Sequence, residues 1–180
     1  MTCIIGFVDK SKRKMIIAGD RLGSNGYTGE VINKPKIFKK KKVLFGYTTS
    51  FRFGQILEHH LKIPKDKRKI PYEYIVKDLL PCIREVLETH KYSSKDDAGK
   101  SGTAIIMYKG FVYTLQDDWS VLEYLNNVSV GSGSEVAMGA MLALRNSKYS
   151  NKKIAKNVIK IVSEVVLSVG GKPDVIELKF

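Results

Sequence analysis

The start of the chain places a nucleophile and a base on one residue. Thr2 follows the initiator methionine, and threonine is small enough for Met1 to be removed in the ordinary way. If Met1 leaves, Thr2 carries a hydroxyl and a free α-amine, and the amine can act as the base that activates the hydroxyl. Cys3 becomes a rival nucleophile only if Thr2 is removed as well. Many chains begin Met-Thr without any catalytic role, so other residues must support this interpretation.

The residues that follow Thr2 predict a β-hairpin. Residues 3–8 are apolar and rich in strand formers, and residues 15–18 repeat the pattern after a basic turn. Asp20 closes the second strand. Residues 21–30 are rich in Gly, Ser, Asn and Thr, which predicts a loop. Further short strands are expected at residues 31–32, 37–38 and 43–47.

Helical spacing appears in two later parts of the chain. Apolar side chains recur at this spacing in residues 50–61 and 72–90, with Ser50 as a cap of the first helix and Pro81 as the site of a kink in the second. A polar loop is expected at residues 92–102, and a second helix pair at residues 135–144 and 153–168. The remaining predicted strands are residues 103–108, 111–115, 121–124, 128–130 and 175–180. Separate runs of strands and helices predict one α+β layered domain over residues 1–180.

The charge and composition of the chain narrow the class of protein. The net charge is +13, with 43% hydrophobic and 27% charged residues, which is an ordinary globular balance apart from the excess of lysine and arginine. The basic runs at residues 10–14, 39–42 and 65–69 fall in predicted turns and loops, where charge runs are usually solvated. None has interleaved aromatic residues, which argues against nucleic-acid binding. Attraction to an acidic partner stays open.

Targeting signals and metal-ligand spacings are not apparent. No apolar run approaches the length of about 20 residues that a membrane span needs, and the first residues lack the layout of a signal peptide. The cytoplasm is therefore the expected compartment. Cys3 and Cys82, like the three histidines, show no ligand spacing, so no cofactor or metal is expected.

Several short motifs occur along the chain in a definite order. A threonine leads the first hairpin, Ala-Gly-Asp ends it at residues 18–20, and Asn-Lys-Pro-Lys-Ile-Phe and Leu-Phe-Gly-Tyr follow at residues 33–38 and 44–47. A glycine–serine turn at residues 128–134 then leads into a helix. This series, which covers nearly the whole chain, resembles the proteasome β-subunit family of N-terminal nucleophile hydrolases. It looks closest to the HslV-type peptidase and its phage and bacterial relatives.

The resemblance implies a role for each of five residues. Thr2 would be the N-terminal nucleophile, and Ser132 would help to hold its amine. Lys34 would lie near Thr2, where its positive charge lowers the pKa of the amine, and Asp20 would hold the ammonium through a charge-assisted hydrogen bond. Gly46 would present a backbone N–H to the negative oxygen that forms when a peptide carbonyl is attacked.

Each supporting residue also has a purely structural interpretation. Asp20 fits a turn after a glycine, Lys34 fits a surface lysine, and Gly46 fits a β-bulge. The turn at residues 131–134 fits the start of a helix that Ser134 caps.

The sequence departs from the family close to its C-terminal end. Family members usually carry an aspartate and a serine at the end of the last long helix, just before a Gly-Gly pair. Here Val166 and Val169 occupy the matching places before residues 170–171, and Ser168 fits only with a shift of one residue.

The resemblance implies a fold, an activity and partners. The fold would be a four-layer αββα sandwich, and the activity that of a threonine-type endopeptidase working through an acyl-enzyme on Thr2. Polypeptide substrates, homo-oligomeric rings and an ATP-driven unfoldase would be the partners. The alternative is a catalytically inactive ring subunit of the same fold, which the departure near residue 170 favours.

Overall fold

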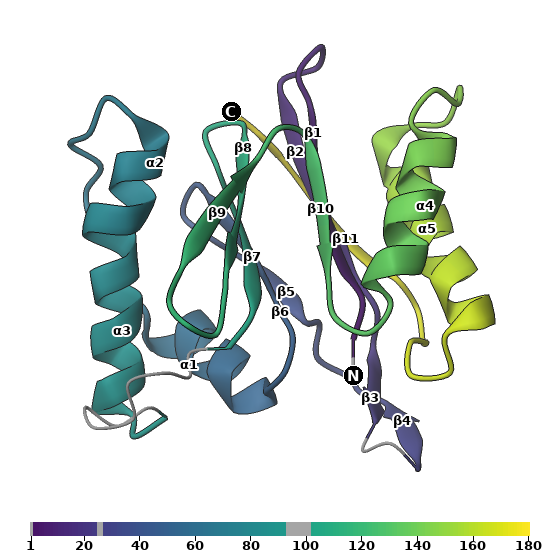
Figure 1. Ribbon diagram of the computed structural model, residues 1–180, viewed down its shortest axis with the longest axis horizontal. Helices are drawn as coiled ribbons and strands as arrows, with labels where there is room; N and C mark the ends of the chain where they lie inside the picture. The colour runs from purple at the N-terminus through teal and green to yellow at the C-terminus, as the bar shows by residue number, and fades with distance from the viewer. Residues whose placement is uncertain (1, 25–26, 93–101) are drawn as a thin grey trace.

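Two antiparallel sheets form the centre of the computed structural model, which describes residues 2–24, 27–92 and 102–180 (Figure 1). The first sheet has the order β10-β1-β2-β11, formed by Asn127–Val130, Ile4–Asp9, Lys14–Gly19 and Asp174–Lys179. The second has the order β5-β6-β7-β8-β9, formed by Ile37–Lys40, Val43–Tyr47, Ala104–Tyr108, Phe111–Leu115 and Val121–Tyr124. A small hairpin, β3 (Leu22–Ser24) and β4 (Gly29–Val31), extends beyond the first sheet.

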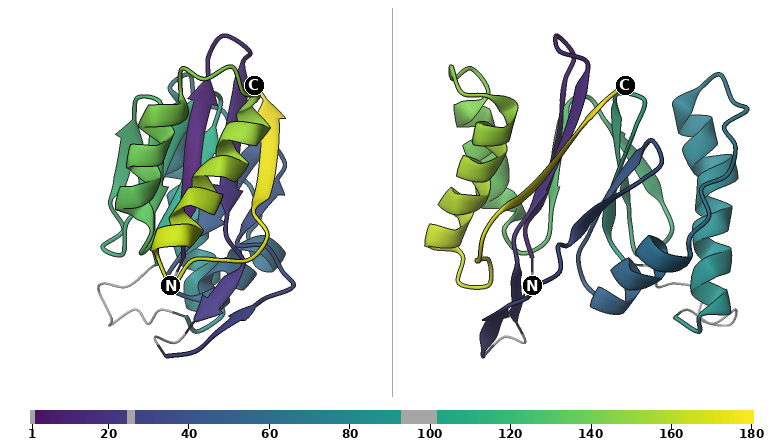
Figure 2. Two further views of the ribbon diagram at one scale, coloured as in Figure 1. Left: turned by 90° about the vertical axis from the view of Figure 1, so that its right-hand side faces the viewer. Right: turned by 180° about the vertical axis from the view of Figure 1, so that it is seen from behind.

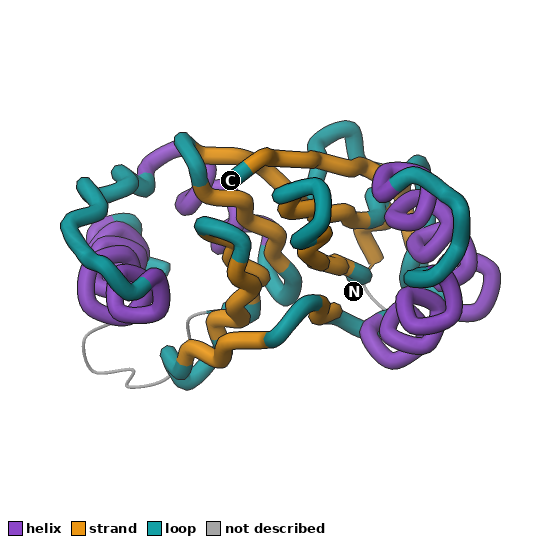
Figure 3. Tube along the Cα trace, turned by 90° about the horizontal axis from the view of Figure 1, so that it is seen from above, coloured by secondary structure: helices purple, strands orange, loops and turns teal. Residues whose placement is uncertain are grey.

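Helices cover the outer faces of both sheets (Figures 2 and 3). The helices are α1 (Phe51–His60), α2 (Pro71–Tyr74), α3 (Leu80–Thr89), α4 (Ser134–Leu144) and α5 (Asn151–Val165), with the π-helical turn η1 (Ile75–Leu79) between α2 and α3. One apolar core joins α1, η1 and α3 to the five-stranded sheet, and another joins α4 and α5 to β1 and β2. A third core lies between the two sheets. The predicted α+β class is confirmed.

Alternation along the strands explains why the first strand is apolar at successive positions. Side chains of neighbouring strand residues point to opposite faces of a sheet. Ile4 therefore lies in the core between the sheets, while Ile5 lies in the core beneath α4 and α5. Both side chains are fully buried, so β1 is fixed on both faces. This matters for the site, because Thr2 lies two residues before Ile4.

The second predicted helix is continuous from α2 to α3 but changes its winding before Pro81. Leu80 N–H donates to Ile75 O, five residues back, within the π-helical stretch. Proline has no N–H to continue an α-helical ladder, and a local widening of this kind is one way in which helices accommodate that loss.

Two parts of the chain differ clearly from the sequence expectation. Residues 22–24 and 29–31 pair as the β3–β4 hairpin, where a loop was predicted at residues 21–30 and a strand at residues 31–32. The last helix ends at Val165, not at Ser168. Most of the predicted loop at residues 92–102 lies outside the described residues.

The predicted tight turn at Lys109 and Gly110 is confirmed, with φ of 47° and 81° as a type I′ hairpin turn requires. No helix in the described part of the chain is long and apolar enough to span a membrane.

Candidate active site

The β1–β2 hairpin fixes the backbone on either side of the candidate nucleophile. Ile4 pairs with Gly19, so Cys3 and Asp20 face each other just beyond the ladder. Cys3 N–H donates to Asp20 Oδ1 at 3.0 Å, and Asp20 N–H donates to Cys3 O at 3.2 Å. Thr2 is 5% exposed. The hairpin therefore positions Asp20 directly beside the residue that follows Thr2.

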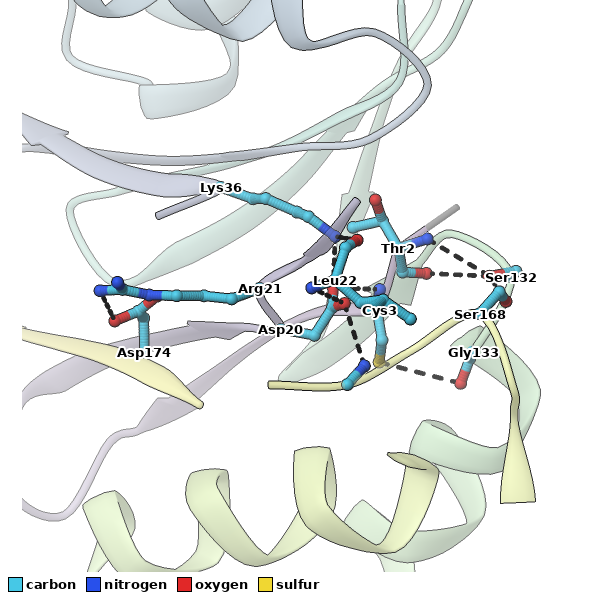
Figure 4. A network of polar contacts seen from close by, with 11 residues as sticks. Thr2, Cys3, Asp20, Arg21, Leu22, Lys36, Ser132, Gly133, Ser168 and Asp174 are labelled. Atoms are coloured by element: carbon cyan, nitrogen blue, oxygen red, sulfur yellow. Dashed lines mark hydrogen bonds and ion pairs between the residues drawn. The ribbon is translucent and has the colours of Figure 1, made fainter. Parts of the chain in front are cut away.

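A buried ion pair lies beneath the start of β1 (Figure 4). Lys36 Nζ is 2.9 Å from Asp20 Oδ1, and the two side chains are 1% and 0% exposed. Asp20 Oδ2 accepts hydrogen bonds from Leu22 N–H at 3.0 Å and Gly170 N–H at 3.3 Å, and Lys36 also donates to Leu22 O at 2.6 Å. Burial lowers the pKa of Lys36, while the neighbouring carboxylate of Asp20 opposes that shift. Backbone donors and one ammonium therefore surround the carboxylate.

The lysine in this pair is Lys36, whereas the resemblance assigned the position to Lys34. Lys34 is exposed, on the approach to β5. Lys36 directly precedes Ile37, and its carbonyl accepts Tyr47 N–H at 3.1 Å, so the edge of the second sheet holds its backbone in place. The sequence has lysines on both sides of Pro35, and only the one adjoining the strand reaches Asp20.

Ser132, which the resemblance assigned to the Thr2 amine, lies at the Thr2 backbone. Thr2 N–H donates to Ser132 Oγ at 3.3 Å, and Thr2 O accepts Gly133 N–H, also at 3.3 Å. Gly131 makes this approach feasible: its φ is +97°, and a Cβ there would lie 2.2 Å from Thr2 O. The turn at residues 131–133 therefore holds the Thr2 backbone, and a side chain at position 131 would displace it.

Ser168 also joins the cluster, although the sequence placed it one residue out of register. Its hydroxyl is 2.9 Å from Ser132 Oγ. Helix α5 ends at Val165, and the following turn, in which Val169 N–H donates to Val166 O at 2.9 Å, carries Ser168 inward to 9% exposure. Ser168 therefore lies beside Ser132. No carboxylate is among the hydrogen-bond partners of these two serines in the described residues.

Gly46 is placed differently from its implied role. It lies inside β6, opposite Ile37 of β5 and Ile105 of β7, with neighbouring strands on both sides. A Cβ at this position would lie 2.5 Å from Ile4 Cγ2 and 2.9 Å from Ile17 Cδ1. This position therefore requires glycine so that the two sheets can approach each other, and its N–H does not face the surface around Thr2.

A strained turn directly after β6 was not expected from the sequence. Thr49 has φ of +78°, and Ser50 N–H donates to Thr48 O at 3.0 Å across it. A three-residue turn with these features matches the rare γ-turn. Positive φ is a genuine outlier for a β-branched residue and tends to occur at functional sites. Thr49 is exposed, and none of the hydrogen bonds recorded for the described residues uses its N–H as donor.

The neighbouring thiol is a poor competitor for Thr2. Cys3 is fully buried, and burial together with the nearby Asp20 carboxylate raises its pKa to about 12. Because the thiolate is the reactive form of cysteine, Cys3 is inert at neutral pH. Arg21, next to Asp20, points away from Thr2 and forms a two-pronged ion pair with Asp174 at 2.6 and 2.7 Å (Figure 4).

The chemistry available here is that of hydroxyl, amine and ammonium groups. Across residues 2–24, 27–92 and 102–180, no three His, Cys, Asp or Glu side chains are grouped so that they could hold a metal ion. The ammonium of Lys36 and the N–H of Cys3 share Asp20 Oδ1, which places a buried positive charge within a few ångströms of the Thr2 backbone.

Comparisons with known structures show the fold. BPH of Thiobacillus denitrificans is 20% identical, with 99% of this chain and 98% of that chain covered and a TM-score of 0.80. The same protein in complex with epoxomicin gives 18% identity, 98% coverage of both chains and a TM-score of 0.79. Eukaryotic HslV from Trypanosoma brucei gives 17% identity, 99% and 100% coverage and a TM-score of 0.71. The fold is therefore of the proteasome type. No family model and no curated protein matches the sequence.

Proposed function

We propose that this chain is a threonine-type endopeptidase, an HslV-like bacterial or phage relative with the four-layer αββα sandwich of N-terminal nucleophile hydrolases. The observation that carries the proposal is the buried Lys36–Asp20 pair beside Thr2, together with Ser132 at the Thr2 nitrogen. An ion pair of this kind is costly to bury. Its location beside a potential N-terminal nucleophile gives the ion pair a role in activating that nucleophile.

The first step depends on the α-amine that removal of Met1 would expose. The amine accepts the proton of the Thr2 hydroxyl as its oxygen attacks the peptide carbonyl. The Lys36 ammonium disfavours a second positive charge nearby, which lowers the pKa of the amine and leaves more of it unprotonated at neutral pH. Asp20 keeps Lys36 in place, and Ser132, supported by Ser168, orients the amine.

The attack generates an oxyanion that needs a backbone donor. We assign this donor to Thr49 N–H in place of Gly46, because Thr49 lies in the exposed turn that follows β6. Tyr47 at the end of β6 hydrogen-bonds to the Lys36 carbonyl, so the turn begins at the same end of the sheets as Lys36. The tetrahedral intermediate then collapses, the amine protonates the leaving nitrogen, and water hydrolyses the acyl-enzyme on Thr2.

The proposed assembly is a homo-oligomeric ring that encloses the sites and takes polypeptide substrates from an ATP-driven unfoldase. Two measurements test the catalytic proposal: mass spectrometry of the mature N-terminus, and peptide hydrolysis by the Thr2→Ala variant. We expect a chain that begins at Thr2 and an inactive variant. Retention of Met1 in an active assembly would rule out the amine-as-base mechanism.

The second candidate function is a non-catalytic ring subunit of the same fold. It is favoured by the absence of a carboxylate from the hydrogen bonds that Ser132 and Ser168 make within the described residues. A covalent probe directed at N-terminal threonine separates the two candidates. Labelling of Thr2 would exclude the non-catalytic one, whereas a processed N-terminus that stays unlabelled would favour it.

A further inference from the structure

A cavity lies at the opposite end of the sheets from Thr2. It has a volume of about 470 Å³ and is bounded by the turn between β1 and β2, the turn between β9 and β10, and the connection between α4 and α5. In Figures 1 and 2 these three segments lie at the end of the molecule away from the N-terminus. The volume falls within the range of about 300–1,000 Å³ that is typical of small-molecule sites.

One side of the cavity is apolar. Met141 of α4 and Ile154 of α5 are 5% and 7% exposed, and Phe7 of β1 packs in the same core, with Leu142 at the rim. These residues come from three elements that are packed together in the core beneath α4 and α5. The apolar wall is therefore fixed before a ligand arrives, and such a wall favours an apolar ligand body.

The other side of the cavity is basic. Lys10, Lys12 and Arg145 line it, and Asp9 is the single carboxylate in the lining. Asp9 already accepts hydrogen bonds from the Ser11 hydroxyl at 2.6 Å, Lys12 N–H at 3.0 Å and Asn151 Nδ2 at 2.8 Å. Within the described residues, neither Lys10 nor Arg145 forms an ion pair. The cavity therefore presents uncompensated positive charge.

A buried hydroxyl in the lining also lacks a partner. Ser147 Oγ is shielded from solvent and makes no hydrogen bond with the described residues. A buried hydroxyl without a partner costs free energy. Because this hydroxyl has no surface open to the cavity, it carries that cost without offering a donor to a ligand.

We propose that this cavity is a second binding site, which takes a small organic acid with one anionic head and an apolar body. The head binds Arg145 and Lys10, because a guanidinium and an ammonium both favour a carboxylate. The apolar body packs against Met141 and Ile154. The site is separate from the Thr2 chemistry, so its occupancy does not depend on catalysis.

Methyl NMR on the full chain, in the assembly in which it purifies, tests the proposal with three probes. These are octanoate, octylammonium of the same length and opposite charge, and inorganic phosphate, which has charge without an apolar body. We expect octanoate to shift the methyl signals of Met141 and Ile154 saturably, while those of Met107 and Ile83, buried in the other two cores, stay in place. Octylammonium and phosphate are expected to bind at least about tenfold more weakly.

Two charge-reversal variants supply a matched comparison. Arg145→Glu is expected to weaken octanoate binding at least about tenfold, whereas Lys148→Glu, in the same connection but outside the cavity lining, is expected to leave it unchanged. The proposal is overturned if octanoate does not bind, if octylammonium binds equally well, or if the two variants behave alike. Equal shifts at Ile83 would likewise overturn it, because they would indicate nonspecific binding.

Discussion

Replacing Lys36 with methionine tests the centre of the proposed site. Methionine has a similar length and no charge, so Lys36→Met removes the partner of a fully buried carboxylate without leaving a large void. Breaking a buried ion pair by removing one partner typically costs about 3–5 kcal/mol, because the other charge is left without compensation. Asp20 keeps three backbone N–H donors, from Cys3, Leu22 and Gly170, so we expect a loss near the lower limit of about 3 kcal/mol.

That loss is large enough to measure by thermal unfolding. For a chain of 180 residues, the unfolding entropy near 60 °C is about 0.4 kcal/mol per degree, so a loss of about 3 kcal/mol lowers Tm by about 8 °C. Circular dichroism at fixed protein concentration gives Tm, and intact mass spectrometry after exposure to a covalent probe directed at N-terminal threonine reports whether Thr2 reacts. We expect Lys36→Met to remain folded at 20 °C and to lose labelling.

Lys34→Met is the matched control, since it makes the same chemical change at an exposed lysine two residues away. An exposed substitution of this kind is expected to change the free energy of unfolding by less than about 0.5 kcal/mol and to leave labelling intact. The assignment of the ion pair fails if the two variants have the same Tm. The catalytic argument fails if Lys36→Met is labelled as quickly as the unmodified chain.

Three further predictions, which use four substitutions, probe the surrounding turns and the thiol. Thr49→Gly should raise the free energy of unfolding by up to about 1 kcal/mol in urea titrations, because it relieves positive φ, and should keep labelling of Thr2 by the same probe; a loss of stability would argue against the strained turn. Gly131→Ala should lower the free energy of unfolding by at least about 2 kcal/mol and abolish labelling. Gly139→Ala, where a Cβ meets nothing within 4 Å, should stabilise α4 by about 0.5–1 kcal/mol; equal effects would contradict the close approach to Thr2. The pKa of Cys3, raised to about 12, makes the free energy of unfolding fall between pH 9 and pH 12, where the unfolded chain loses the thiol proton and the folded chain keeps it. This thiol contributes about 1.4 kcal/mol per pH unit to the slope. In pH-dependent urea titrations the slope for Cys3→Ala should be smaller by that amount, while Tyr47 and Tyr74, whose pKa values burial also raises, keep their contributions; an identical slope would refute the buried thiol.

Much of the fold could be predicted because its signals are local. The hairpin at residues 3–18, the helices and the type I′ turn at Lys109 and Gly110 depend on side-chain periodicity and turn chemistry within a short window. The β3–β4 hairpin was missed because its two strands are short and contain glycine. Strands of this length show no alternation of apolar and polar residues from which pairing could be predicted. The end of the last helix was misplaced by three residues, since apolar residues continue to Val169 although the backbone has already turned.

The candidate site also contains some residues that could be placed from the sequence and one that could not. Thr2, Asp20 and Ser132 are brought together because each directly adjoins a predicted strand or helix, so that element placement alone fixes them. The lysine could not be chosen reliably from the sequence, because Lys34 and Lys36 both lie on the extended approach to β5, and only the pairing of Ile37 with Gly46 decides which of them lies beneath Asp20.

Gly46 and Thr49 illustrate two different reasons why a position can favour glycine, namely close packing and positive φ. A glycine is required at position 46 because Ile4 and Ile17 from the opposite sheet leave no room for a Cβ, which is a packing requirement that no local pattern reveals. The position where positive φ calls for glycine is Thr49, and there the chain carries a β-branched residue and bears the strain. Strain at this position is consistent with a functional turn, whose backbone N–H the proposed mechanism uses. Substrate contacts should therefore be sought in the turn that follows β6, and not at Gly46 inside β6.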